Sequence, residues 1–340
     1  MIFFLISQSY MTVGSILSCE VVAGEFRDCT GVVYTVMWTI GYVYVGVLTL
    51  CIRKWRYLYL AATLPGAITL IYIWLLPESP HWMASHRDIK GLQKYVDTAT
   101  IFNSKQVNLN DCVVTEEVQK RPEWEIRRTV LDLFRWKRLL FMISINGFIV
   151  LVMNFYYFAL SFDSVYLSED KLTGYLLMGL VELPAGIIAV PVMHRFGRRS
   201  ISVVCLATQG LILLTAVVFD GMQINHIDLI LIGKTMNSIA FVAHPLLVTE
   251  MIPTTLRTVA YSFVNIPESI GILTSPLLKY ADLEGGKIPC LILGCLSLVA
   301  ALLAVVLPET KGHPMPEDIE DMQLGPFLEF FKRRSQRNHT

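Results

Sequence analysis

Charged side chains are scarce in this sequence. Aspartate, glutamate, lysine and arginine together make up 16% of its 340 residues, whereas a soluble domain carries about 25%. Hydrophobic residues make up 54%, and the mean hydropathy is +0.53. So few charges cannot cover a water-facing surface, which excludes an ordinary soluble protein and predicts a membrane protein.

Signals for conventional enzyme chemistry are also missing. The seven cysteines form no CxxC pair and have no histidine at metal-ligand spacing, so we expect neither a zinc site nor a disulfide framework. The sequence has no phosphate-binding glycine loop, no GxSxG elbow and no HExxH pair, which predicts neither an enzyme nor a cofactor. Its 28 basic residues equal its 28 acidic ones, so no basic surface for a nucleic acid is expected.

Long apolar stretches dominate the sequence instead. A helix needs about 20 apolar residues to cross the ~30 Å core of a bilayer, because every backbone amide must be bonded within its own segment. The sequence therefore predicts an all-α membrane protein with nine spans. These cover residues 2–23, 30–52, 57–76, 139–161, 171–193, 200–219, 227–251, 257–278 and 288–307.

The distribution of basic residues predicts how the spans are oriented. Twenty-one of the 28 lysines and arginines fall on one side of the spans, six fall on the other, and Lys234 lies within a span. Because loops rich in lysine and arginine stay in the cytoplasm, we place residues 77–138 and 308–340 inside the cell. The N-terminus then lies outside.

Four short strings stand at the ends of predicted spans: LPESPHWMAS, HRFGRRS, TEMIPTTLR and LPETKGHPMPEDIED. Proline and acid at a helix exit fix where the helix ends, and arginines at the membrane edge can pair with carboxylates of neighbouring helices. Together the strings resemble those of the organic ion transporters of the major facilitator superfamily. This group of solute carriers includes the organic cation, organic anion and carnitine carriers, and the resemblance covers nearly the whole chain.

The resemblance implies a major facilitator fold. Members of the family have twelve helices in two six-helix bundles around a central cavity, and one bundle rocks against the other. On this plan the chain begins at the fourth helix and lacks the first three. We expect residues 1–76 to be the rest of the N-terminal bundle, 77–138 the cytoplasmic central loop, 139–307 the C-terminal bundle and 308–340 a cytoplasmic tail.

Two ionisable residues lie deep in predicted spans, where a charge costs about 2.5 kcal/mol or more. Glu182, in VELPAG, matches a cavity glutamate of the cation carriers, which implies a cation contact or a coupling charge. The alternative is an interhelix bond that sets the bundle. Lys234, in GKTMNS, matches a basic position of the tenth family helix, and we expect a gating pair with a carboxylate. The alternatives for Lys234 are contact with an anionic substrate and snorkelling towards the membrane surface.

An aromatic run occupies residues 155–158 of the fourth predicted span. Most of the run is typical of core packing. The resemblance nevertheless implies that Tyr157 and Phe158 line the cavity, where rings can hold organic cations. It also implies that Tyr34 and Thr35 of the second span face the cavity.

Charged residues near the cytoplasmic ends of the spans form a further group. The resemblance implies that Glu20 and Glu250 pair with basic loop residues and so lock the outward-facing state. The basic residues are Arg27, Arg195, Arg198, Arg199 and Arg257. His194 stands where the family motif usually opens with an acidic residue, which weakens any part of the lock that depends on that carboxylate.

One position of the eleventh family helix is acidic in cation carriers and basic in anion and carnitine carriers. In this sequence it is Ser269, which is neither, while Glu182 is kept. We therefore expect a plasma-membrane carrier that moves small organic ions, cations or zwitterions before anions, by alternating access. The rival hypothesis is a truncated product without transport activity of its own.

Overall fold

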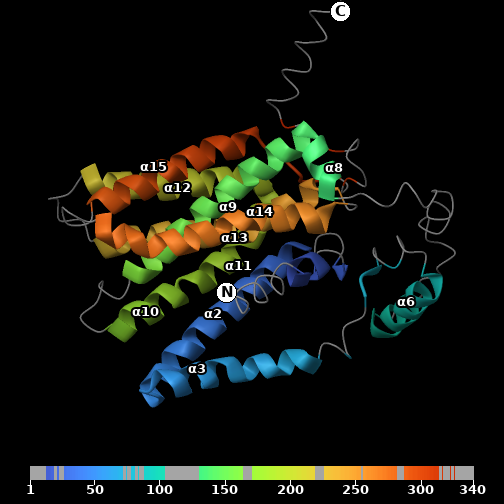
Figure 1. Ribbon diagram of the computed structural model, residues 1–340, viewed down its shortest axis with the longest axis horizontal. Helices are drawn as coiled ribbons and strands as arrows, with labels where there is room; N and C mark the ends of the chain where they lie inside the picture. The colour runs from blue at the N-terminus through green and yellow to red at the C-terminus, as the bar shows by residue number, and fades with distance from the viewer. Residues whose placement is uncertain are drawn as a thin grey trace, which may run out of the picture. The chain divides into compact units, whose positions relative to one another are not determined.

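Helices form all the regular structure in the part of the chain that the computed structural model describes. That part comprises residues 13–18, 21–22, 27–71, 74, 78–80, 83, 88–103, 130–163, 171–218, 226–253, 256–281, 287–313, 316, 322 and 325. The helices are α2 (Arg27–Cys51), α3 (Trp55–Thr63), η2 (Leu64–Ile71), α6 (Ile89–Asn103), α8 (Val130–Arg135), α9 (Lys137–Asp163), α10 (Lys171–Leu180), α11 (Glu182–Phe196), α12 (Arg198–Val218), α13 (His226–Met251), α14 (Arg257–Thr274), η6 (Ser275–Ala281) and α15 (Lys287–Val306) (Figure 1).

Six helices among the described residues are long and apolar enough to cross a membrane. They are Cys29–Cys51, Lys137–Phe162, Leu172–Phe196, Arg198–Val218, Asp228–Met251 and Lys287–Val306. Two further predicted spans, 57–76 and 257–278, are each an α-helix that continues as a 3-10 helix. The first predicted span, 2–23, lies largely outside the described residues.

The chain divides into two compact units, residues 1–27 with 52–129 and residues 28–51 with 130–340. In the first unit, Asp88 caps α6, because its carboxylate accepts a 3.0 Å hydrogen bond from the backbone N–H of Gly91. The second unit holds α2 from residue 28 together with α8–α15. The assignment of residues 1–76 and 139–307 to two bundles stays a prediction.

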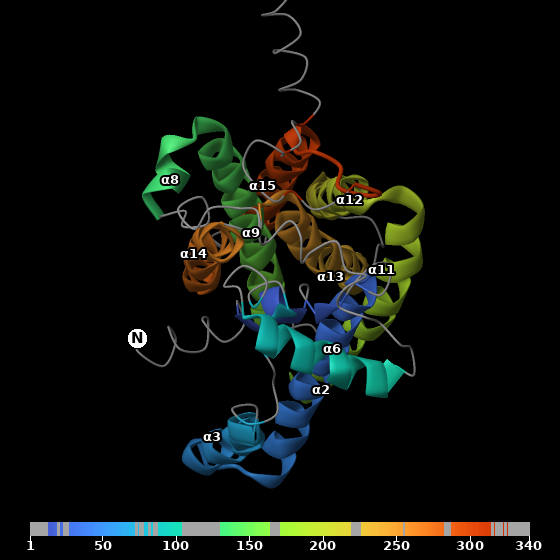
Figure 2. The same ribbon diagram turned by 90° about the vertical axis from the view of Figure 1, so that its right-hand side faces the viewer.

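Within the second unit, α9 and α12–α15 lie together in both Figure 1 and Figure 2. α12 packs against α13 and α15, α9 packs against α14 and α15, and α11 packs against α13. A buried cluster lies where α9, α12, η6 and α15 meet. Its members are Phe155, Tyr156, Ala159, Leu160, Leu213, Leu278 and Leu293.

One proline and one glycine set the two ends of α11. Pro184 has no N–H to bond the carbonyl of Leu180, the residue at which α10 ends. α11 therefore begins after a turn, and Glu182 is its first residue. At the other end of α11, Gly197 adopts a φ of +90°, a left-handed conformation that favours glycine. This turn lets α12 start at Arg198, directly after α11.

A buried polar network ties α9, α12, α13 and α15 together. The amide nitrogen of Asn237 donates to Gln209 Oε1 at 3.1 Å and to the Met153 carbonyl at 3.4 Å. Gln209 Nε2 in turn donates to Ser297 Oγ at 3.2 Å. Hydrogen bonds between buried side chains of different helices fix which helices are neighbours.

Glycines allow α12 and α15 to approach closely. A Cβ atom at Gly210 would lie 2.9 Å from the carbonyl oxygen of Gly294 and 3.1 Å from Ser297 Cβ. By contrast, a Cβ atom at Gly41 on α2 would meet no described atom within 4 Å beyond its own helix backbone. The surroundings of Gly41 are therefore open.

We expect Gly210→Ala to destabilise the protein by about 1–3 kcal/mol, because the added methyl group overpacks the contact between α12 and α15. Gly41→Ala is the matched control and should be neutral or slightly stabilising, since alanine favours a helix by roughly 0.5–1 kcal/mol over glycine. Thermal unfolding of both variants in detergent measures the difference, and equal unfolding temperatures would contradict the packing argument.

Candidate functional site

The centre of the second unit holds a buried ion pair. Lys234 Nζ on α13 lies 3.3 Å from Glu182 Oε1 on α11, and the two side chains are 0% and 3% exposed. A charge in such surroundings carries a large desolvation cost unless an opposite charge and hydrogen bonds compensate it. The structure therefore places Lys234 against a carboxylate, and not at a membrane surface.

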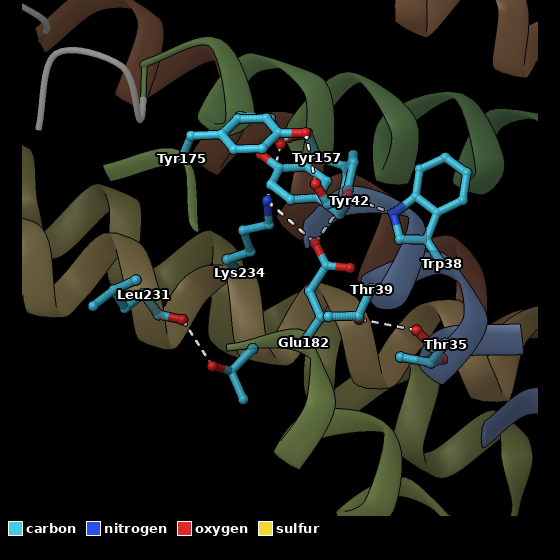
Figure 3. A network of polar contacts seen from close by, with 11 residues as sticks. Thr35, Trp38, Thr39, Tyr42, Tyr157, Tyr175, Glu182, Leu231 and Lys234 are labelled. Atoms are coloured by element: carbon cyan, nitrogen blue, oxygen red, sulfur yellow. Dashed lines mark hydrogen bonds and ion pairs between the residues drawn. The ribbon is translucent and has the colours of Figure 1, made fainter. Parts of the chain in front are cut away.

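Hydroxyl groups complete the coordination of the pair (Figure 3). Tyr157 donates a hydrogen bond to Glu182 Oε1 at 2.8 Å, and Lys234 Nζ donates one to Ser161 Oγ at 2.9 Å. The indole nitrogen of Trp38 on α2 donates to the Tyr157 hydroxyl oxygen at 2.8 Å. A continuous chain of hydrogen bonds thus runs from α2 through α9 to α11.

Aromatic rings surround the ammonium group of Lys234. Its Nζ lies 4.4 Å from the ring centroid of Tyr157 and 5.5 Å from that of Tyr42. The rings of Phe158 and Phe241 form T-shaped contacts with the Tyr157 ring, with centroid distances of 5.2 and 5.7 Å. Since ring faces attract cations, this arrangement has the chemistry to hold an ammonium group beside a carboxylate.

The contacts of the pair given above do not include the other residues expected at the cavity. Thr35 Oγ1 bonds the Gly31 carbonyl of its own helix at 3.0 Å, and its methyl group faces Gly186. Tyr34 is 40% exposed. Ser269 is half-buried on α14, a helix that packs mainly on α9. The hydrogen bonds and ring contacts given above involve neither Tyr34 nor Ser269.

A second charged cluster lies where α11 ends and α12 begins. The Glu309 carboxylate, from the segment after α15, accepts hydrogen bonds from the backbone N–H groups of Arg198, Arg199 and Ser200 at 2.9–3.3 Å. It also accepts one from Ser200 Oγ at 3.2 Å. A carboxylate here satisfies free N–H groups and complements the positive end of the helix dipole.

The same segment also contacts the preceding helix. Lys311 Nζ donates to the carbonyl groups of His194 and Arg195 near the end of α11. A cation at this end complements the negative end of the helix dipole. The segment thus places opposite charges on the two facing helix ends.

Glu250, near the end of α13, belongs to this cluster. Its Oε2 lies 3.5 Å from Arg198 Nε and accepts a 2.6 Å hydrogen bond from Thr310 Oγ1. Arg257 is buried and donates to the carbonyl groups of Thr249 and Ile252, so it braces the turn between α13 and α14.

The remaining members of the expected lock are placed differently. The Arg195 guanidinium group lies over the ring of Phe196, and Arg199 Nη1 donates to the Leu307 carbonyl. Glu20 and the side chain of Arg27 lie outside the described residues. Of the predicted acid–base pairs, the structure therefore brings together Glu250 with Arg198.

Several members of both sites are not among the residues predicted from the sequence. Trp38 and Tyr42 follow Thr35 at intervals of three and four residues, so they share its helix face, and this periodicity was the available signal. Glu309 and Lys311 stand in one of the strings that carry the resemblance, yet nothing local indicates that they bind helix ends. Among the described residues, no group of histidine, cysteine, aspartate and glutamate could hold a metal ion.

Comparisons with known proteins agree with these features. The family model for the sugar (and other) transporters matches residues 10–322. A putative transporter of Caenorhabditis elegans is 35% identical over 93% of this chain and 54% of its own length. Solute carrier family 22 member 7 of Rattus norvegicus is 31% identical over 88% of this chain and 56% of its own. An organic cation transporter protein of Drosophila melanogaster is 29% identical over 91% and 58%.

The chain thus spans just over half the length of these curated relatives, which are transporters by name. Among solved structures, the proton:xylose symporter XylE, a major facilitator protein, aligns with a TM-score of 0.65 at 18% identity. The alignment covers 89% of this chain and 69% of that protein. A likeness at this identity shows a shared fold.

We expect Glu182→Gln to lower the free energy of unfolding by about 3–5 kcal/mol, because it leaves the Lys234 ammonium group buried without its partner. The double variant Glu182→Gln/Lys234→Met should recover most of this loss, since it removes the uncompensated charge. Thermal unfolding in detergent compares the variants. A double variant less stable than Glu182→Gln alone would argue against the pair.

The Glu309 cap can be tested in the same way. We expect Glu309→Gln to cost about 1–2 kcal/mol, because the amide replaces a carboxylate at the positive end of α12. His313→Gln, a change at an exposed residue of the same segment, should leave the unfolding temperature unaltered. Identical unfolding of Glu309→Gln and the unmodified protein would show that the cap contributes little.

Proposed function

Because the chain belongs to the sugar (and other) transporter family and shares the major facilitator fold, we propose that it carries small organic ions across a membrane by alternating access. It is a multi-pass membrane protein. The relatives that it matches include solute carrier family 22 proteins. The observation that carries the proposal is the buried Glu182–Lys234 pair, enclosed by aromatic rings.

The pair offers a physical route to reversible binding. An organic ammonium group that reaches the site competes with Lys234 for the Glu182 carboxylate and for the face of the Tyr157 ring. Glu182 and Tyr157 would then contact the substrate, and Phe158, which forms a T-shaped contact with Tyr157, would hold the Tyr157 ring in place. Lys234 acts as an internal cation that keeps the empty site neutral, which is the gating role expected for it.

The charges of the pair favour cationic and zwitterionic substrates over anionic ones. Glu182 accepts a cationic group directly, whereas an anion would have to displace Glu182 from Lys234 and leave a carboxylate buried without its partner. A zwitterion satisfies both partners, because its two charges can replace the two internal ones. Ser269 adds neither a positive nor a negative charge to the cavity. Tyr34 and Thr35 remain proposed cavity positions.

The cluster around Glu309 and Glu250 serves as the proposed lock. Its charged contacts hold the adjacent ends of α11, α12 and α13 to the segment after α15. The arginine-rich turn between α11 and α12 lies on the predicted cytoplasmic side. Breaking these contacts would let the helix ends separate as the carrier changes state.

Uptake into liposomes tests the proposal. We expect the purified protein to take up radiolabelled tetraethylammonium and glycine betaine in preference to benzoate. Glu182→Gln should reduce cation uptake at least about tenfold, since that factor corresponds to only ~1.4 kcal/mol of lost interaction. Asp228→Asn, an acidic residue that is exposed on α13, is the matched control and should transport normally.

Two outcomes would contradict the proposal in different ways. Uptake equal to that of protein-free liposomes for all three probes would argue against transport by this chain. Benzoate uptake that exceeds uptake of both other probes would leave transport in place and would overturn the expected preference for positive charge.

A further inference from the structure

Two tyrosines from different helices stack beside the ion pair. The rings of Tyr42 on α2 and Tyr175 on α10 have centroids 4.0 Å apart and lie within 12° of parallel. The Tyr175 hydroxyl group also donates a 3.2 Å hydrogen bond to the backbone carbonyl of Tyr42. The stack therefore joins α2 to α10 through both side chain and backbone.

Glycines on both helices provide the space for the stack. A Cβ atom at Gly179 of α10 would lie 2.5 Å from Cδ1 of the Tyr42 ring. A Cβ atom at Gly46 of α2 would lie 3.2 Å from Cε1 of Tyr175 and 2.8 Å from Leu176 Cδ2. Each ring thus lies against a glycine of the opposite helix, which makes the contact close and reciprocal.

The stack lies between the ion pair and one end of the helices. Trp38 lies at the level of the pair, because its indole N–H donates to the Tyr157 hydroxyl group, which in turn donates to Glu182. Tyr42 follows Trp38 by four residues and so lies about 6 Å nearer the end of α2 at Cys51. Tyr175 precedes Glu182 by about two turns, towards the start of α10 at Lys171.

The Tyr42 ring contacts the pair as well as the stack. Lys234 Nζ lies 5.5 Å from its centroid, and Figure 3 shows Tyr42 and Tyr175 near the amino end of the Lys234 side chain. A cation attracts the face of a tyrosine ring. The position of the Lys234 ammonium group therefore affects how firmly Tyr42 is held in the stack.

We propose that Tyr42 and Tyr175 form an aromatic gate that closes the Glu182–Lys234 site at the membrane face where α2 ends and α10 begins. The proposal rests on the proposed transport function. In the closed arrangement Lys234 stabilises Tyr42. A substrate cation that displaces Lys234 from Glu182 removes this contact, and α2 and α10 then separate at the stack.

Accessibility of a buried cysteine tests the gate without requiring a substrate. Thr39 lies on α2 one turn before Tyr42, away from the end of the helix at Cys51, and the residue is 1% exposed. Its hydroxyl group donates a hydrogen bond to the carbonyl of Thr35 in the same helix. Thr39→Cys is introduced into protein in which exposed Cys29, Cys51 and Cys295 are replaced by serine. A membrane-impermeant thiosulfonate is then applied to cells from the face at which α2 ends.

We expect Tyr175→Ala to raise the rate of Cys labelling at least about tenfold, because it removes both the stack and the hydroxyl bond. Tyr175→Phe keeps the ring and should raise the rate by roughly two- to fivefold. Leu177→Ala, a change at an exposed residue two positions along α10, is the matched control and should stay within about twofold of the parent.

The outcomes separate the gate from the transport function. Equal labelling rates for the parent, Tyr175→Ala and Tyr175→Phe overturn the gate, whatever the uptake assay shows. Faster labelling of the tyrosine variants with no uptake by the parent supports the gate and contradicts the proposed transport. Elution of each variant as a single peak in detergent excludes misfolding as the cause of faster labelling, and Tyr175→Phe decides the question if Tyr175→Ala fails this control.

Discussion

The buried ion pair between Glu182 and Lys234 is the interaction on which the second unit depends. Either charge alone would carry a desolvation cost of several kcal/mol, so α11 and α13 must stay in contact while the site is empty. Tyr157 and Ser161 orient the two partners, and Trp38 orients Tyr157 in turn. The pair is stable with its internal cation in place, and under the proposed function it would rearrange when a charged substrate group replaces one partner.

α11 connects this pair to the cluster at its opposite end. The helix has 15 residues, from Glu182 to Phe196, and so spans about 21 Å. Lys311 binds carbonyl groups at its far end, while Glu309 binds the first N–H groups of α12. Charged contacts thus hold both ends of one helix, and a shift of that helix must alter both sets of contacts. This gives a physical link between the ion pair and the proposed lock.

The sequence predicted the fold better than it predicted the site. Spans follow from apolar length, because a bilayer leaves backbone amides no partner outside their own helix. Glu182 and Lys234 were identifiable because isolated charges within apolar stretches are costly, and the family resemblance added Tyr157, Phe158, Glu250 and Arg198. Trp38, Tyr42 and Tyr175 escaped notice, since aromatic residues in a span equally suit packing against lipid or core. Glu309 was noticed only as part of a string.

The amino-acid sequence by itself determined that this is a helical membrane protein, where most of its helices lie, and which charges need partners. These properties arise from local requirements that act along the chain: backbone hydrogen bonding, apolar length, and the conformational limits of proline and glycine. Only the tertiary structure decided that Lys234 pairs with Glu182, that Tyr42 stacks on Tyr175, and that Glu309 caps α12. Each of these choices depends on the distance between helices far apart in the sequence, which close packing between them sets.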